Sequence, residues 1–212
     1  MQLETLDAAH HAPYYSLGRP GPAIRHVWFC LHGHEQPVAE LAAQLVHLDT
    51  PERLLILPQA PVTGLSAEQS VWFTPASLGP NLAFTRTFLD QLADHILTAC
   101  PPDTPYTVLG YGHGATAASV WLASNRFRYE RLIFYAAVFP SGIRRAQLFA
   151  ALPHHPIVVA ATTADTFTPE AEGQGLVLDL RAAGQSAQLR YVDDGPLTLA
   201  ALGAGGDGSG AR

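Results

Sequence analysis

The sequence predicts an α/β fold, in which a mostly parallel central sheet carries helices on both faces. Two observations predict this class: short apolar runs alternate with amphipathic segments, and the apolar runs are rich in β-branched and aromatic residues. A chain of 212 residues is long enough for one domain with a full-sized core. We assign residues 1–202 to a single domain and residues 203–212, GAGGDGSGAR, to a flexible glycine-rich tail.

The elements follow one another as strand and helix along most of the chain. The first 20 residues are expected to form loop or edge-strand structure. Strands are expected at residues 25–31, 53–57, 106–111, 131–136, 156–161 and 187–192. Helices are expected at residues 38–48, 82–99, 113–125 and 169–183, with Pro169 at the first helical position and Gly184 just past the end.

Composition excludes several functions. The formal net charge of -6 leaves no basic surface for nucleic acid or an anionic membrane. All twelve basic residues are arginine, so lysine-based chemistry is excluded. Two cysteines, Cys30 and Cys100, suggest a reducing compartment, and no leader or long apolar run is recognisable. We therefore expect a cytoplasmic protein.

Residues 108–118, VLGYGHGATAA, join a predicted strand to a predicted helix through a glycine-rich turn. This is the setting of a nucleophile elbow of the G-x-S-x-G type. Four further motifs surround it in chain order: LHGHE at 31–35, LPQAP at 57–61, VWF at 71–73 and TAD at 163–165. Over about residues 25–197 the chain thus resembles the α/β-hydrolase fold, and more narrowly the phospholipase/carboxylesterase family that includes acyl-protein thioesterase-like enzymes.

The turn places Gly112 at the nucleophile position. Residues two before and two after the nucleophile must be small, since a Cβ atom there collides between strand and helix. Gly110 and Gly114 satisfy this requirement around Gly112, whereas Tyr111 and Ala115 would flank His113. The nucleophile position therefore has no side chain.

The general base is missing as well. The resemblance makes Asp165 the relic of the triad acid, and the base of this fold follows the acid in the chain. None of the ten histidines follows Asp165, and the family's Gly-His pair is replaced by Gly195-Pro196. We predict a pseudoenzyme without the serine mechanism. Alternatively or additionally, Asp165 caps the helix that follows it.

A ligand site can survive this loss. The resemblance implies oxyanion donors at the backbone N–H of His113 and at an N–H of the loop 32–35, which would hold an anion or a carbonyl oxygen. The alternative is that glycine at position 112 merely relieves backbone strain in the turn. Candidate ligand-binding residues are His32, Gly33, His34, Trp72, Phe73, Tyr111, His113 and Gly114. Trp72 and Phe73 could instead be packed under a loop, and Tyr111 could be a pocket wall or an alternative acid.

A metal site is a second hypothesis for the same region. His32, His34 and His113 could bind a metal, with Glu35 or Asp165 as a carboxylate ligand, and a metal-bound water would replace the serine. The alternative is that His32 is a structural histidine, hydrogen-bonded within its loop. No cofactor is otherwise expected.

Three functions remain open from the sequence. The first is a degenerate hydrolase-fold protein that binds a small molecule in the old pocket. The second is a weak or metal-assisted hydrolase of carboxylic esters or thioesters, and the third is a structural or regulatory subunit. The family's C-terminal helix is short or absent here, which leaves an apolar edge that a homodimer would cover.

Overall fold

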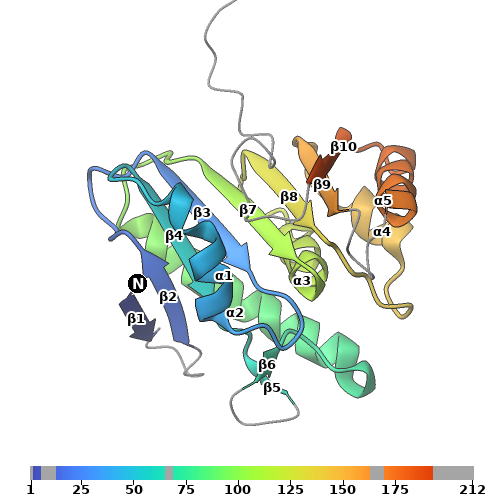
Figure 1. The fold of residues 1–212 in the computed structure, drawn as a ribbon, viewed down its shortest axis with the longest axis horizontal. Coiled ribbons are helices and arrows are strands. Elements are labelled where there is room, and N and C mark those ends of the chain that lie inside the picture. The colour runs from blue at the N-terminus through green and yellow to red at the C-terminus, as the bar shows by residue number, and fades with distance from the viewer. Residues whose placement is uncertain (1, 6–12, 65–68, 163–169, 193–212) are drawn as a thin grey trace, which may run out of the picture.

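The computed structural model describes residues 2–5, 13–64, 69–162 and 170–192, which form one eight-stranded sheet flanked by helices (Figure 1). The strands of this sheet are β1 (Gln2–Thr5), β2 (Pro13–Leu17), β3 (His26–Leu31), β4 (Arg53–Pro58), β7 (Tyr106–Tyr111), β8 (Arg131–Tyr135), β9 (Ile157–Thr162) and β10 (Ala187–Val192). The α-helices are α1 (Val38–Leu45), α2 (Leu78–Thr98), α3 (His113–Leu122), α4 (Arg145–Ala150) and α5 (Glu170–Ala182). Shorter elements are the hairpin of β5 (Val62–Thr63) and β6 (Ser70–Val71) and the 3-10 turns Val46–Leu48 and Pro75–Ser77.

The strand order is β1-β2-β4-β3-β7-β8-β9-β10. The pairings from β4 to β10 are parallel, whereas β2 is antiparallel to β4 and β1 is antiparallel to β2. All six predicted strands are confirmed, and the N-terminal segment supplies β1, at one edge of the sheet, and its neighbour β2. Because parallel strands end at a common edge, the loops that follow β3, β7 and β8 meet there.

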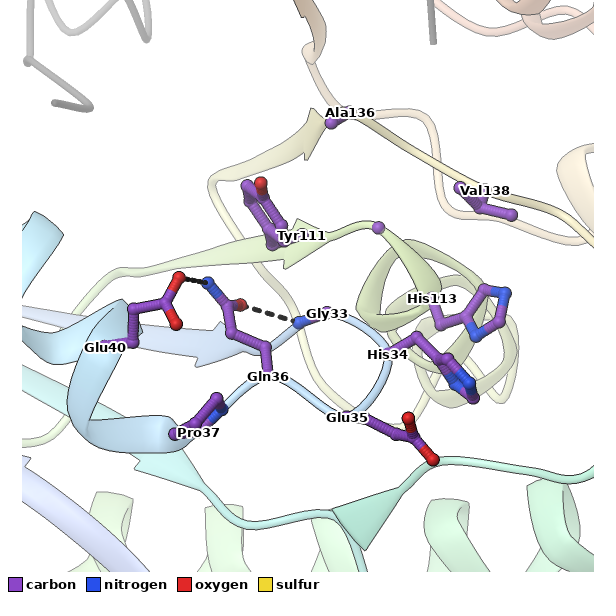
Figure 2. Close-up of a pocket in the computed structure, with 11 residues that line it drawn as sticks. Gly33, His34, Glu35, Gln36, Pro37, Glu40, Tyr111, His113, Ala136 and Val138 are labelled. Atoms are coloured by element: carbon purple, nitrogen blue, oxygen red, sulfur yellow. Dashed lines mark hydrogen bonds between the residues drawn. The ribbon is translucent and has the colours of Figure 1, made fainter. Parts of the chain in front are cut away.

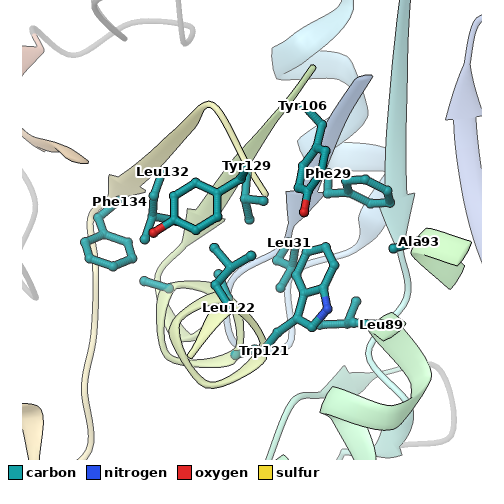
Figure 3. Close-up of a cluster of buried hydrophobic side chains, with 14 of the residues drawn as sticks. Phe29, Leu31, Leu89, Ala93, Tyr106, Trp121, Leu122, Tyr129, Leu132 and Phe134 are labelled. Carbon is teal, nitrogen blue, oxygen red and sulfur yellow. The ribbon is translucent and has the colours of Figure 1, made fainter. Parts of the chain in front are cut away.

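Helices cover both faces of the sheet, as predicted. On one face α1 packs its buried leucines against β3 and β4. On the other face α2, α3 and α5 share one core with the opposite side of the same strands. Figure 3 shows the centre of that core, where Trp121 of α3 packs with Leu89 of α2 and with Phe29 of β3. The Phe29 and Trp121 rings meet edge to face at 5.4 Å, a favourable aromatic geometry.

The element bounds differ from the predictions in a few places. Helix α2 begins at Leu78 rather than at residue 82, since Pro80 is tolerated within a first helical turn. Helix α4 and the β5–β6 hairpin were not predicted. Gly184 has a φ of +86°, which fits the stop expected after α5. Within the described residues, no helix has the length and apolarity needed to cross a membrane. The expected C-terminal tail and shortened C-terminal helix lie outside the described residues.

Candidate functional site

The elbow, residues 110–114, links β7 to α3 in the predicted way. Gly112 lies at its tip with φ 52° and ψ -120°, a backbone conformation that glycine adopts readily. A Cβ atom on Gly110 would lie 2.5 Å from the Ala115 Cα, and one on Gly114 would lie 2.7 Å from the His32 carbonyl oxygen. Both flanking positions therefore require glycine, and Gly112 is at the tip as predicted.

The tip is held by hydrogen bonds to the end of β8 and to the loop after it. The Gly112 N–H donates to the Tyr135 carbonyl, and the Val138 N–H donates to the Gly112 carbonyl, both at 3.0 Å. A Cβ atom on Gly112 would lie 3.4 Å from the Gly33 Cα, its nearest neighbour, which is an ordinary contact. The site thus has room for a side chain that the sequence does not supply.

Two backbone N–H groups face this region without a partner among the described residues. The Gly33 N–H is occupied, because it donates to the Gln36 side-chain oxygen at 2.9 Å. The N–H groups of His34 and His113 form no such bond, and no side chain caps the start of α3. The His34 nitrogen lies 4.0 Å from the Cβ position built on Gly112. These two N–H groups are therefore suited to hold a ligand oxygen.

A cavity of about 450 Å³ opens over the tip, and we call it the Gly112 cavity (Figure 2). This volume suits a small molecule. Its lining residues are Gly33, His34, Glu35, Gln36, Pro37, Glu40, Tyr111, Gly112, His113, Ala136 and Val138. Of the residues predicted to bind a ligand, the structure brings together Gly33, His34, Tyr111 and His113 around Gly112.

The other four predicted ligand-binding residues are not among those that line the Gly112 cavity. Gly114 is buried where α3 approaches β3. Trp72 is buried and donates from Nε1 to the His32 carbonyl at 2.8 Å, so it is the loop-packing residue of the alternative interpretation. Phe73 is also buried, and its ring centroid lies 4.8 Å from that of His113, so it packs against that histidine. His32 is the fourth of these residues.

His32 is a structural residue, and its geometry contradicts the metal hypothesis. Its side chain is fully buried, Nδ1 donates to the Gly33 carbonyl at 2.7 Å, and Nε2 accepts from the Ala60 N–H at 3.0 Å. Neither ring nitrogen is free to ligate a metal. Accordingly, no group of three metal-ligating side chains gathers within the described part of the chain. The loop histidine instead connects the segments after β3 and β4.

The remaining two histidines form a pair beside the cavity. The rings of His34 and His113 meet edge to face with their centroids 4.7 Å apart, and Figure 2 shows them side by side. Burial, together with the charge of His34, lowers the pKa of His113 to about 4. The His113 imidazole is therefore neutral at physiological pH.

Some cavity residues were not predicted as ligand-binding residues. Gln36 and Pro37 directly precede α1, Glu40 lies in its first turn, and Ala136 and Val138 come from the loop after β8. The rule that ligands bind at the carboxyl ends of parallel strands points to the latter pair, once β8 is placed beside β7. Asp165 and the Gly195-Pro196 pair lie outside the described residues.

No protein-family model matches the chain, and no curated protein matches it either. Solved structures do match. Esterase PE8 is 17% identical, with 96% of each chain covered and a TM-score of 0.71. Acyl-protein thioesterase 2 of Zea mays is 18% identical over 90% of this chain and 94% of its own, with a TM-score of 0.66. A phospholipase/carboxylesterase from Dyadobacter fermentans DSM 18053 is 15% identical over 93% of this chain and 95% of its own, with a TM-score of 0.62. The chain therefore has the α/β-hydrolase fold that its motifs predict.

Proposed function

We propose that this protein is a pseudoenzyme of the α/β-hydrolase fold that binds a small molecule in the Gly112 cavity. One observation carries the proposal. Gly112 lies at the nucleophile position without a side chain, while the N–H groups of His34 and His113 are unpartnered among the described residues. A carbonyl or anionic oxygen of the ligand would accept hydrogen bonds from both. The start of α3 adds a partial positive charge at the same point.

The residues present do not support serine-type hydrolysis. Without a hydroxyl or thiol at position 112 no acyl-enzyme forms, and no histidine follows Asp165 to act as the base. Oxyanion donors alone leave an acceleration of about 10³-fold to 10⁴-fold over water in enzymes whose triads have been removed. Such a rate is too slow for an enzyme and is compatible with a binding role.

The two other functions that the sequence left open have less support. The chain resembles solved structures of esterases and of a thioesterase, so weak hydrolysis of carboxylic esters or thioesters is the second candidate. Its metal-assisted form loses support, because His32 has no free nitrogen. A purely structural or regulatory subunit is the weaker alternative, because Trp72 and Phe73 pack beneath the loop and leave the cavity open.

An ester assay tests the proposal directly. We expect the purified protein to release p-nitrophenolate from p-nitrophenyl butyrate no faster than a few turnovers per hour, with and without a chelator, because it lacks a nucleophile. Turnover that a chelator abolishes would support the metal-assisted hydrolase. Turnover that persists with the chelator would show that a nucleophile other than residue 112 exists, and would overturn the pseudoenzyme.

The same assay on Gly112→Cys tests the oxyanion donors. The introduced thiolate would attack the ester carbonyl, expel p-nitrophenolate and leave a thioester, while the developing oxyanion is held by His34 and His113. We expect one equivalent of product, released at least tenfold faster than from the exposed control Gly79→Cys. Cys30 and Cys100 are buried and give little background. Equal rates at the two positions would contradict a functional oxyanion site.

Self-association is a separate part of the proposal. We infer that the chain forms a homodimer through the edge that a C-terminal helix covers in the family that the sequence resembles. Sedimentation velocity at micromolar concentration is expected to give a dimer of about 45 kDa, twice the 22.7 kDa of the chain. A clean monomer across that concentration range would argue against the homodimer and leave the binding role untouched.

A further inference from the structure

The wall of the Gly112 cavity carries two carboxylates, and its basic members among the described residues are two histidines, His34 and His113. Glu35 and Glu40 are its acidic members, and neither lysine nor arginine is among the lining residues. Neither carboxylate forms an ion pair with another described residue. Glu40 only accepts a long hydrogen bond, 3.4 Å, from the Gln36 amide. Neither carboxylate is therefore paired with a basic side chain in the described part of the chain.

The positive charge at the oxyanion site is much smaller than the negative charge of the two carboxylates. The start of an α-helix is equivalent to about half a positive charge, and two N–H dipoles contribute locally. His113 adds none, because burial and the charge of His34 lower its pKa to about 4. A ligand with a full negative charge would gain at the N–H groups but would be repelled by Glu35 and Glu40. A neutral carbonyl gains the hydrogen bonds without that repulsion.

The arrangement of the two carboxylates extends this argument to the rest of the ligand. Figure 2 shows the Glu40 carboxylate beside Gln36 and the Glu35 carboxylate on the side of His34. Glu35 belongs to the loop that joins β3 to α1 and Glu40 to the first turn of α1, whereas Gly112 belongs to the elbow. A cation on the ligand would therefore find an unpaired carboxylate on either side of the oxyanion site.

We propose that the ligand is a carbonyl compound with a cationic group, such as an amine-bearing ester, thioester or amide. Its carbonyl oxygen binds the N–H groups of His34 and His113, and its ammonium group lies toward one of the two carboxylates, Glu35 or Glu40. This inference rests on the proposed binding function and narrows its ligand from an anion or carbonyl to a cationic carbonyl compound. Amides of this class also serve as probes that a weak esterase would not consume.

Three primary amides of matched length test the proposal. They are 6-aminohexanamide, which is cationic, heptanamide, its neutral isostere, and adipic acid monoamide, which is anionic. Dissociation constants are measured by NMR titration at low salt. We expect the cation to bind about fivefold more tightly than heptanamide, as two partly exposed carboxylates allow, and the anion to bind more weakly than heptanamide. The advantage of the cation should fall at 0.5 M salt.

Charge variants separate the possible outcomes. In the double variant Glu35→Gln/Glu40→Gln the cation and heptanamide should bind equally, whereas Glu52→Gln, an exposed change at the other end of the sheet, should preserve the fivefold ratio. The proposal of a cationic ligand would be overturned if the cation and heptanamide bound equally to the unmodified protein, or if the cation kept its advantage in the double variant. Binding of heptanamide would in either case still support the cavity as a binding site. If none of the three amides binds at 10 mM, or if they still bind after Gly112→Cys is blocked with iodoacetamide, the binding function itself is wrong.

Discussion

Gly114→Ala is expected to lower the free energy of unfolding by about 3 kcal/mol or more, because α3 lies against β3 at this point. The added Cβ atom would lie 2.7 Å from the His32 carbonyl oxygen and closer still to that of Leu31. Both are backbone atoms of a central strand and its loop, which cannot move aside as a flexible side chain would. Urea unfolding followed by circular dichroism measures the change.

Two other glycines provide matched controls for this substitution. Gly175 lies in the middle of α5, where an added Cβ atom meets nothing within 4 Å. Gly175→Ala should therefore raise the free energy of unfolding by about 0.5–1 kcal/mol, the usual gain in helix propensity. Gly112→Ala has room but retains a positive φ, so a loss of about 1 kcal/mol is expected. A Gly114→Ala protein as stable as the unmodified one would contradict the close approach of α3 to β3.

His32→Ala is expected to cost about 3 kcal/mol of stability at pH 7. The substitution removes the hydrogen bond to the Gly33 carbonyl and leaves the buried Ala60 N–H without its acceptor. A buried unpaired donor costs roughly 1–3 kcal/mol, and the space left by the ring adds to this loss. Phe73→Leu, also buried but without a hydrogen bond, is a suitable control and should cost about 1 kcal/mol.

The same histidine makes stability depend on pH. Burial lowers the pKa of His32 from 6.5 to about 4, so the unfolded chain binds a proton at a higher pH than the folded chain does. The stability that the neutral His32 contributes is present above pH 6.5 and is lost as the pH falls toward 4. We expect the free energy of unfolding to fall by about 2 kcal/mol from pH 7 to pH 5 through His32 alone, with His113 adding to the fall.

His32→Ala should make this pH dependence shallower, and His113→Gln should remove the second contribution. Unfolding curves at pH 5, 6 and 7 for the three proteins provide the comparison. An unmodified protein whose stability is constant between pH 7 and pH 5 would contradict a buried, neutral His32.

The cavity shows which parts of the site were predictable. Gly112 and its flanking glycines were identified because the collision that demands a small residue is local, between atoms a few residues apart. The side chains of Glu40 and Gln36 were missed because nothing in their spacing shows that the start of α1 borders the elbow. The hypothesis that His32 binds a metal failed for a related reason. The partner of its Nε2 is the Ala60 N–H, which lies 28 residues away.

The fold likewise contains elements that the sequence predicted and elements that it did not. Strands with continuous apolar runs were found, because a strand buried on both faces has a strong local pattern. Helix α4 was missed, because its six residues include only one that is buried, Phe149, and carry little periodic signal. Helix α2 was found but predicted too short at its start, where Pro80 reads as a helix breaker although the first turn accepts it.

By itself the sequence determined the fold class, the order of most elements and the position of the glycine-rich turn between β7 and α3. These properties depend on local periodicity, on glycine sterics and on which residue types are present at all. Only the tertiary structure decided which N–H groups lack a partner among the described residues, that His32 is structural, and that Glu35 and Glu40 border the cavity. Those features depend on contacts between segments that are distant along the chain, and the sheet brings these segments together at the carboxyl ends of its parallel strands.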